Sequence, residues 1–174
     1  MLKYLRRQKK LPIDREYFLS LLGGSEGGLA TTTAIIVGLM VSSASREVVV
    51  TSALVAFLVQ AFNGSIGHFS SERTNDEIDD IEKKEGYRKP AKDALYYFLS
   101  HTATSLIVLM PVVIITDSLN AIIVTLSISL FILFTIGWYK GSVVKNSRFV
   151  DGMEMVMFGL LVIVVGALSG LALR

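Results

Sequence analysis

Five long stretches of the chain contain no Asp, Glu, Lys or Arg. They are Gly27–Ser45, Val48–Phe69, Ala94–Thr116, Leu119–Tyr139 and Met155–Leu173. The shortest has 19 residues, and a helix needs about 20 mostly apolar residues to cross roughly 30 Å of hydrocarbon. Because these stretches are continuously apolar, they predict helices rather than the alternating strands of a membrane barrel. We therefore expect an all-α membrane protein with five transmembrane helices.

The composition excludes several other classes of protein. Hydrophobic residue types make up 52% of the 174 residues and charged types 18%, which is too apolar for a soluble domain of this size. The sequence contains no cysteine, so a disulfide framework and a cysteine nucleophile are excluded. The net charge of +2 gives no electrostatic support for a nucleic-acid partner. Residues 1–174 are expected to form a single five-helix domain in the lipid bilayer.

The distribution of Lys and Arg predicts how the chain is oriented. Of the 17 basic residues, 15 lie before the first stretch, between the second and third, or between the fourth and fifth. Because basic residues concentrate in cytoplasmic loops, the N-terminus is predicted to be cytoplasmic and the C-terminus to lie on the opposite side. The protein is thus expected to be multi-pass, in the cell membrane of a prokaryote or an organelle membrane of a eukaryote. Apolar residues before Gly27 extend the first helix back to Glu16.

The only sizeable loop, residues 70–93, is acidic and is predicted to be a short cytoplasmic helical segment. Glu72, Asp76 and Asp80 fall at i, i+4 and i+8 of a helical extension expected over Glu72–Lys84. Like charges at this spacing repel one another unless a cation joins them. The three acids are therefore candidates for gathering metal ions from the cytosol. The alternative is a solvated helix whose acids are neutralised by neighbouring lysines.

Three ionisable residues from three different helices are expected to lie at one level of the membrane. With a rise of about 1.5 Å per residue, Glu26, His68 and Glu154 each lie about 28–30 Å from the outer ends of their helices. Asn63 lies about 7 Å further into the membrane. Ionisable groups inside or at the ends of spans are functional candidates. The alternative is that each one only marks the water interface of its own helix.

Carboxylates and imidazole are suitable ligands for ferrous iron, manganese or zinc, and they release protons when a metal binds. The four residues therefore predict a metal site near the cytoplasmic face. Glycines four residues apart, including Gly23 with Gly27 and Gly24 with Gly28, indicate close packing of the first helix against another helix.

The first helix reads Glu-Gly-Gly-Leu-Ala-Thr-Thr-Thr-Ala-Ile-Ile-Val-Gly over residues 26–38, and the second ends Gly-Ser-Ile-Gly-His-Phe-Ser-Ser-Glu-Arg over residues 64–73. Together with Pro90-Ala91 before the third helix and the basic loop before the fifth, these segments resemble the vacuolar iron transporter family of ferrous and manganous ion carriers. The resemblance covers roughly Tyr17–Leu173. The chain has Gly27, Gly64 and His68 where the family has aspartate, methionine and glutamate.

The resemblance implies a homodimeric exchanger of metal ions for protons, and not an enzyme, that carries Fe²⁺ or Mn²⁺ away from the cytosol without a prosthetic group. First helices from two subunits would line the path. Glu26 would bind the ion and exchange a proton, and His68 and Asn63 would complete the site. Since a shift of one residue turns a helical side chain by about 100°, Glu26 can serve only if the first helix is broken or rotated at its glycines. The alternative hypothesis is a non-transporting scaffold or regulatory protein of the same fold.

Overall fold

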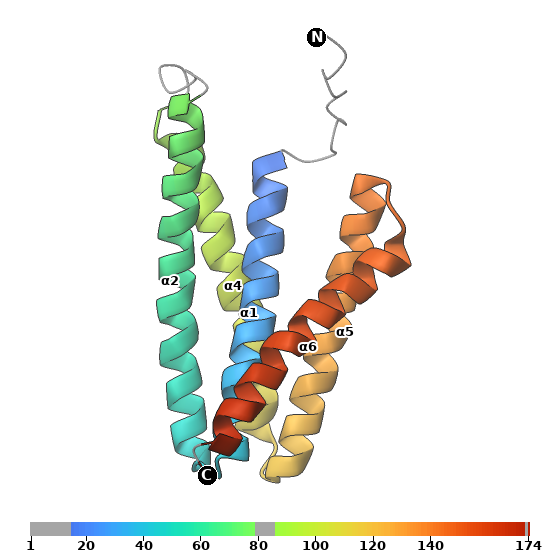
Figure 1. Cartoon of the computed structure of the whole chain (residues 1–174). Coiled ribbons are helices and arrows are strands. Elements are labelled where there is room, and N and C mark those ends of the chain that lie inside the picture. The colour runs from blue at the N-terminus through green and yellow to red at the C-terminus, as the bar shows by residue number, and fades with distance from the viewer. Residues whose placement is uncertain (1–14, 79–85, 173) are drawn as a thin grey trace.

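The computed structural model describes residues 15–78, 86–172 and 174, and over these residues the chain forms five helices and no strand (Figure 1). The helices are α1 Arg15–Val41, α2 Arg46–Ile78, α4 Arg88–Ile114, α5 Ser118–Val144 and α6 Arg148–Ala172. All five are long and apolar enough to cross a membrane. The prediction of an all-helical, multi-pass membrane protein is therefore confirmed.

Helix α1 begins at Arg15, one residue before the predicted start, and continues without interruption to Val41. The helix is therefore not broken at its glycines. A side chain at Gly24 would place its Cβ 2.5 Å from the Tyr97 carbonyl oxygen of α4, so the glycines serve a close helix–helix contact instead. Helix α2 continues to Ile78, and the remainder of its predicted extension lies outside the described residues.

Short connections join the helices into antiparallel pairs. Between α1 and α2, Ser43 adopts a positive φ of 63°. Between α4 and α5, the Asp117 side chain accepts a hydrogen bond of 2.9 Å from the backbone N–H of Asn120 and so caps the start of α5. Lys145 ends α5 in the left-handed conformation. Each turn reverses the chain within a few residues, so successive helices cross in opposite directions.

Helix α1 is the centre of the bundle. It packs mainly on α4 and α6, while α2 packs on α4 and α5 on α6, and it is the most buried of the five spans. In Figure 1, α1, α4 and α6 all begin at the end where the loop between α2 and α4 lies, and the α5–α6 pair diverges from the other helices toward that end. We refer to this end as the N-terminal end and to the other, which holds the short turns after α1 and α4, as the opposite end.

The apolar core lies mainly toward the opposite end. Its largest cluster includes Ile36 of α1, Val49 and Phe57 of α2, and Leu109 and Val112 of α4. A second cluster joins α1, α4 and α5 through Leu29, Val108 and Leu133. Many large apolar side chains point outward, as expected for helices whose surroundings are lipid. The N-terminal half of the α1–α4 contact is therefore formed by side chains that do not belong to these two clusters.

Candidate metal-ion site

Helices α1 and α4 run in the same direction and pack in register. At the N-terminal end, Glu16 forms an ion pair of 2.5 Å with Lys89. Four turns further along, the Thr32 hydroxyl donates a hydrogen bond of 2.9 Å to the Ser105 hydroxyl. Both pairs join residues 73 positions apart in the sequence. We call this contact, from Glu16–Lys89 to Thr32–Ser105, the α1–α4 seam.

Glycines bring the two backbones together in the middle of the seam. A Cβ on Gly28 would lie 2.5 Å from the carbonyl oxygen of His101, and one on Gly24 would be equally close to the carbonyl oxygen of Tyr97. No real side chain fits at such distances. The sequence-based expectation of a closely packed first helix agrees with this contact, and the partner helix is α4.

Three aromatic side chains lie in a row beside the glycines of α1. The Tyr97 ring lies between the two imidazoles of the chain, with its centroid 4.8 Å from that of His68 and 5.9 Å from that of His101. Positions 23 and 27, which lack side chains, face the row: a Cβ on Gly27 would lie 3.3 Å from His101 Nδ1, and one on Gly23 would lie 3.7 Å from His68 Nε2. The two glycines therefore provide the space that the imidazoles occupy.

Glu26 lies beside this row. Its side chain is half-buried and interacts electrostatically with Tyr97. His101 is only 2% exposed, and neither of its ring nitrogens has a hydrogen-bond partner among the residues that the structure describes; the same holds for Nδ1 of His68. A buried polar atom that stays unpaired costs about 1–3 kcal/mol, so water or a ligand is expected at these nitrogens.

The other predicted ligands lie apart from this cluster. Asn63 is exposed on the surface of α2. Glu154 is 3.5 Å from the ammonium of Lys140, across the α5–α6 pair. Glu26, His68 and Glu154 do not form the expected group, because no three His, Asp or Glu side chains within residues 15–78 and 86–172 are placed to hold a metal together. The helical rise gives the depth of a residue but not the direction in which its side chain points.

The acidic segment after α2 is only partly described. Glu72 is half-buried on the last turns of α2, and it takes part in an interaction with its surroundings. Asp76 belongs to the same helix, but its side chain lies outside the described part, and Asp80 lies outside it altogether. The prediction that these acids gather metal ions stays a prediction.

Sequence reasoning left two residues of the cluster, Tyr97 and His101, out of the predicted site. A signal for both was available in the spacing of polar residues on α4. Every fourth residue from its first turn onward is polar, and these are Lys89, Asp93, Tyr97, His101 and Ser105. In an apolar helix, residues four apart share a face, and so the row indicates a polar contact with another helix.

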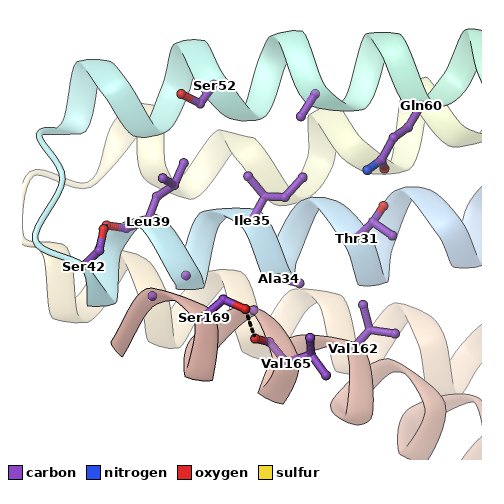
Figure 2. A pocket seen from close by; sticks show the side chains of 14 residues that line it. Thr31, Ala34, Ile35, Leu39, Ser42, Ser52, Gln60, Val162, Val165 and Ser169 are labelled. Atoms are coloured by element: carbon purple, nitrogen blue, oxygen red, sulfur yellow. Dashed lines mark hydrogen bonds between the residues drawn. The ribbon is translucent and has the colours of Figure 1, made fainter. Parts of the chain in front are cut away.

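A groove of about 520 Å³ runs along the opposite half of α1, between α2 and α6. Figure 2 shows Thr31, Ile35 and Leu39 of α1 at its floor, with Gln60 of α2 and Ser169 of α6 on its two sides. The lining is mostly apolar and small. The Thr31 hydroxyl donates a hydrogen bond to the Gly27 carbonyl oxygen, which satisfies its polar group within α1. The groove leaves part of α1 uncovered by the rest of the chain.

Ionisable side chains gathered between membrane-spanning helices mark the paths of ions and protons, so the five-helix fold and this cluster are typical of a membrane ion transporter. A family model narrows the class: the model of the VIT family, the vacuolar iron transporters, matches residues 76–171, more than half of the chain. The chain therefore belongs to the VIT family. Its general activity is transport of metal ions across a membrane, which is not an enzyme activity in the usual sense. No curated protein matches the chain in a sequence comparison.

Proposed function

We propose that this protein exchanges a divalent metal ion, Fe²⁺ or Mn²⁺, for protons and removes the metal from the cytosol. The observation that supports this most strongly is the half-buried carboxylate of Glu26, which lies with His68 around Tyr97 inside apolar helices. A carboxylate and an imidazole are ligands for both metals. They lose protons when the metal binds and regain them when it leaves. Two protein ligands need completion by water or by a second subunit.

The charge distribution supports an orientation with the N-terminal end in the cytosol. Basic residues lie where α1, α4 and α6 begin, including Arg15, Arg88, Lys89 and Arg148. The acidic residues at the end of α2 lie at the same end (Figure 1), where they would feed cations to the site. Basic residues favour the cytoplasmic side, so metal entering at this end leaves the cytosol.

We further propose that two copies associate through α1. The family resemblance implies a path lined by first helices from two subunits. In this chain the groove between α2 and α6 leaves Thr31, Ile35 and Leu39 of α1 open. Small residues in the groove, among them Ala34 and Gly38, allow a second helix to approach closely.

Metal transport in reconstituted vesicles tests the proposed site. Purified protein is inserted in phosphatidylcholine–phosphatidylglycerol vesicles that contain a metal-sensitive dye, and Mn²⁺ entry is followed together with internal pH. Glu26→Gln removes the charge but keeps the shape, and is expected to reduce Mn²⁺ flux about tenfold or more, because a neutral amide is a weaker ligand and carries no exchangeable proton. Glu47→Gln, an exposed change at the opposite end of the bundle, should leave the flux unaltered.

The possible outcomes separate the hypotheses. Wild-type flux in Glu26→Gln would show that the site is assigned to the wrong residue. If the wild type itself carries no Mn²⁺ and no Fe²⁺, the protein is a non-transporting scaffold or regulatory member of the family. Metal flux without any change in internal pH would exclude proton exchange.

A further inference from the structure

The α1–α4 seam contains a row of polar groups on α4 that extends beyond the proposed metal ligands Glu26 and His68. On α4 the row consists of Lys89, Asp93, Tyr97, His101 and Ser105. It covers 16 residues, or about 24 Å at 1.5 Å per residue, and thus reaches from the N-terminal end to the middle of the span.

Three of the five groups in this row, Asp93, His101 and Ser105, are buried, and Lys89 and Tyr97 are half-buried. Asp93 and Ser105 are fully buried, as are Ser20 and Thr32 on α1. The register of the seam places Ser20 opposite Asp93, because these residues are also 73 positions apart. Ionisable and hydroxyl groups are costly in the apolar interior of a membrane protein, and aliphatic residues would pack there at no such cost. The burial of Asp93, His101 and Ser105 in one seam therefore calls for a role beyond packing.

The row is open toward one end of the bundle only. Beyond Ser105 the same interface becomes apolar, with Ile36 of α1 and Leu109 and Val112 of α4 all buried in the main hydrophobic cluster. At the other end the row begins with the Glu16–Lys89 ion pair, whose side chains are 29% and 25% exposed. Polar groups therefore lead from the N-terminal end inward and stop at an apolar barrier.

We propose that the α1–α4 seam is the path by which protons reach the ion site at Glu26, with Asp93 and His101 as the proton-carrying groups. This proposal rests on the proposed exchange of metal for protons and names the route that the protons take. Successive residues of the row rise by about 6 Å along α4. One water molecule with two hydrogen bonds of about 2.8 Å spans nearly this distance, so the path requires a single water between neighbours.

The transfer balances with one proton and no electrons. A proton from bulk water passes by way of Asp93 to one ring nitrogen of neutral His101, and the other ring nitrogen releases a proton toward the Glu26 carboxylate as the metal leaves. His101 ends neutral, as it began. Both ring nitrogens of His101 are without hydrogen-bond partners among the described side chains and backbone groups, which leaves one free to accept a proton and the other free to give one up.

Few other titratable groups surround His101. Tyr97 of α4 stacks on it, and the Tyr97 ring is in turn close to His68 of α2 and interacts electrostatically with Glu26 of α1. Helix α5, which also contacts α4, has no ionisable residue between Asp117 and Tyr139. The acids of α6 are engaged elsewhere: Glu154 with Lys140, and Asp151 with the side-chain amide of Asn146.

Two shape-preserving variants test the path in the Mn²⁺ vesicle assay. Asp93→Asn and His101→Gln remove a protonatable group, and each is expected to reduce the metal-driven proton flux at least about tenfold. Mn²⁺ binding to purified Asp93→Asn should stay within about twofold of the wild type, because Asp93 lies outside the cluster around Tyr97. Thr125→Val is the matched control: it replaces a fully buried hydroxyl on α5, bonded to the Val108 carbonyl oxygen, and should leave proton flux unchanged.

A second measurement does not depend on transport. The chain has two histidines, so in a ¹⁵N-histidine-labelled His68→Gln variant the imidazole signals belong to His101. A water-connected His101 is expected to become protonated as the pH is lowered and to exchange its ring protons rapidly with water. A single neutral tautomer, protected from exchange at every pH at which the protein stays folded, would overturn the path.

The two measurements separate failure of the path from failure of the proposed function. Wild-type proton flux per metal ion in both Asp93→Asn and His101→Gln overturns the path and leaves metal transport standing. Absence of Mn²⁺ flux in the wild type overturns the proposed function, and the histidine spectra then decide whether the seam is a hydrated proton path. If either variant fails to fold, the spectra decide in the same way.

Discussion

Gly24 and Gly28 set the distance between α1 and α4, and through it the position of every side chain in the seam. Neither adopts a conformation that requires glycine; both lie in a regular helix. They matter because the backbone of α4 occupies the space that a side chain at either position would need. Close contact of this kind is how helices associate in lipid, where the hydrophobic effect does not drive them together.

Gly28→Ala is therefore expected to destabilise the protein by about 1–3 kcal/mol, as overpacking does in other tightly packed interiors. Its Cβ would meet the His101 carbonyl oxygen at 2.5 Å, which requires the helices to separate. Thermal unfolding in detergent, followed by the fluorescence of Trp138, measures the change. Gly67→Ala is the control, since nothing lies within 4 Å of a Cβ at this helical position. Equal melting temperatures for the two variants would contradict the close contact.

Glu26 and His68 could be singled out from the sequence because an ionisable residue within an apolar span or at its end is unusual whatever it contacts. The role of His101 could not be derived in the same way. It depends on the register between α1 and α4, which is fixed by Gly24, Gly28 and the Thr32–Ser105 hydrogen bond. Glu154, in contrast, was predicted as a ligand from its depth alone. The pairing of α5 with α6 places it beside Lys140 instead.

At the scale of elements, the charge-free stretches predicted the number and type of helices but not where they begin. Helix α6 starts at Arg148, seven residues before the stretch that begins at Met155. A charge-free run measures the thickness of hydrocarbon, whereas a helix continues into the headgroup layer, where charged side chains are tolerated. At the N-terminal end of the bundle, the helices accordingly extend beyond the charge-free stretches.

The end of α4 is held by a side chain from another element. Arg46, in the first turn of α2, donates from Nε to the Val112 carbonyl oxygen at 2.8 Å and from its terminal nitrogen to the carbonyl oxygen of Val113. The last carbonyls of a helix have no partner within it, and a positive charge is favourable there. Arg46 thus ties the α1–α2 turn to the end of α4.

Arg46→Gln should lower the free energy of unfolding by about 1 kcal/mol, less than the roughly 1.5–3 kcal/mol of hydrogen bonds to charged groups, because Arg46 is exposed. The change is measured as a lower melting temperature in detergent. Glu47→Gln alters the neighbouring exposed residue and is expected to melt as the wild type does. A melting temperature for Arg46→Gln that also equals the wild type would show that the tie contributes nothing.

At the scale of the molecule, the chain consists of an α1–α2–α4 unit and an α5–α6 pair that meet along α1. Helix α6 crosses α1 where Gly166 and Gly170 approach Gly38, with a Cβ on Gly38 only 2.6 Å from the Gly166 carbonyl oxygen. This close crossing places α6 on one side of α1 and leaves α2 on the other, so the groove follows from the packing. Sequence reasoning predicted close packing of the first helix but could not predict which side of it would stay open.

If two copies associate through this groove, residues on its rim lie near the symmetry axis, where each residue faces its own counterpart. The chain has no cysteine, so a single introduced cysteine can form a disulfide only between copies. Ser52→Cys, on the α2 side of the groove (Figure 2), is expected to give a covalent dimer when membranes are oxidised, since a disulfide requires Cα atoms within about 7 Å. Phe131→Cys, on α5 with a 71% exposed side chain, is the control and should remain monomeric. Dimers from Phe131→Cys and none from Ser52→Cys would place the subunit contact on α5 instead, and the open face of α1 would then be covered by lipid.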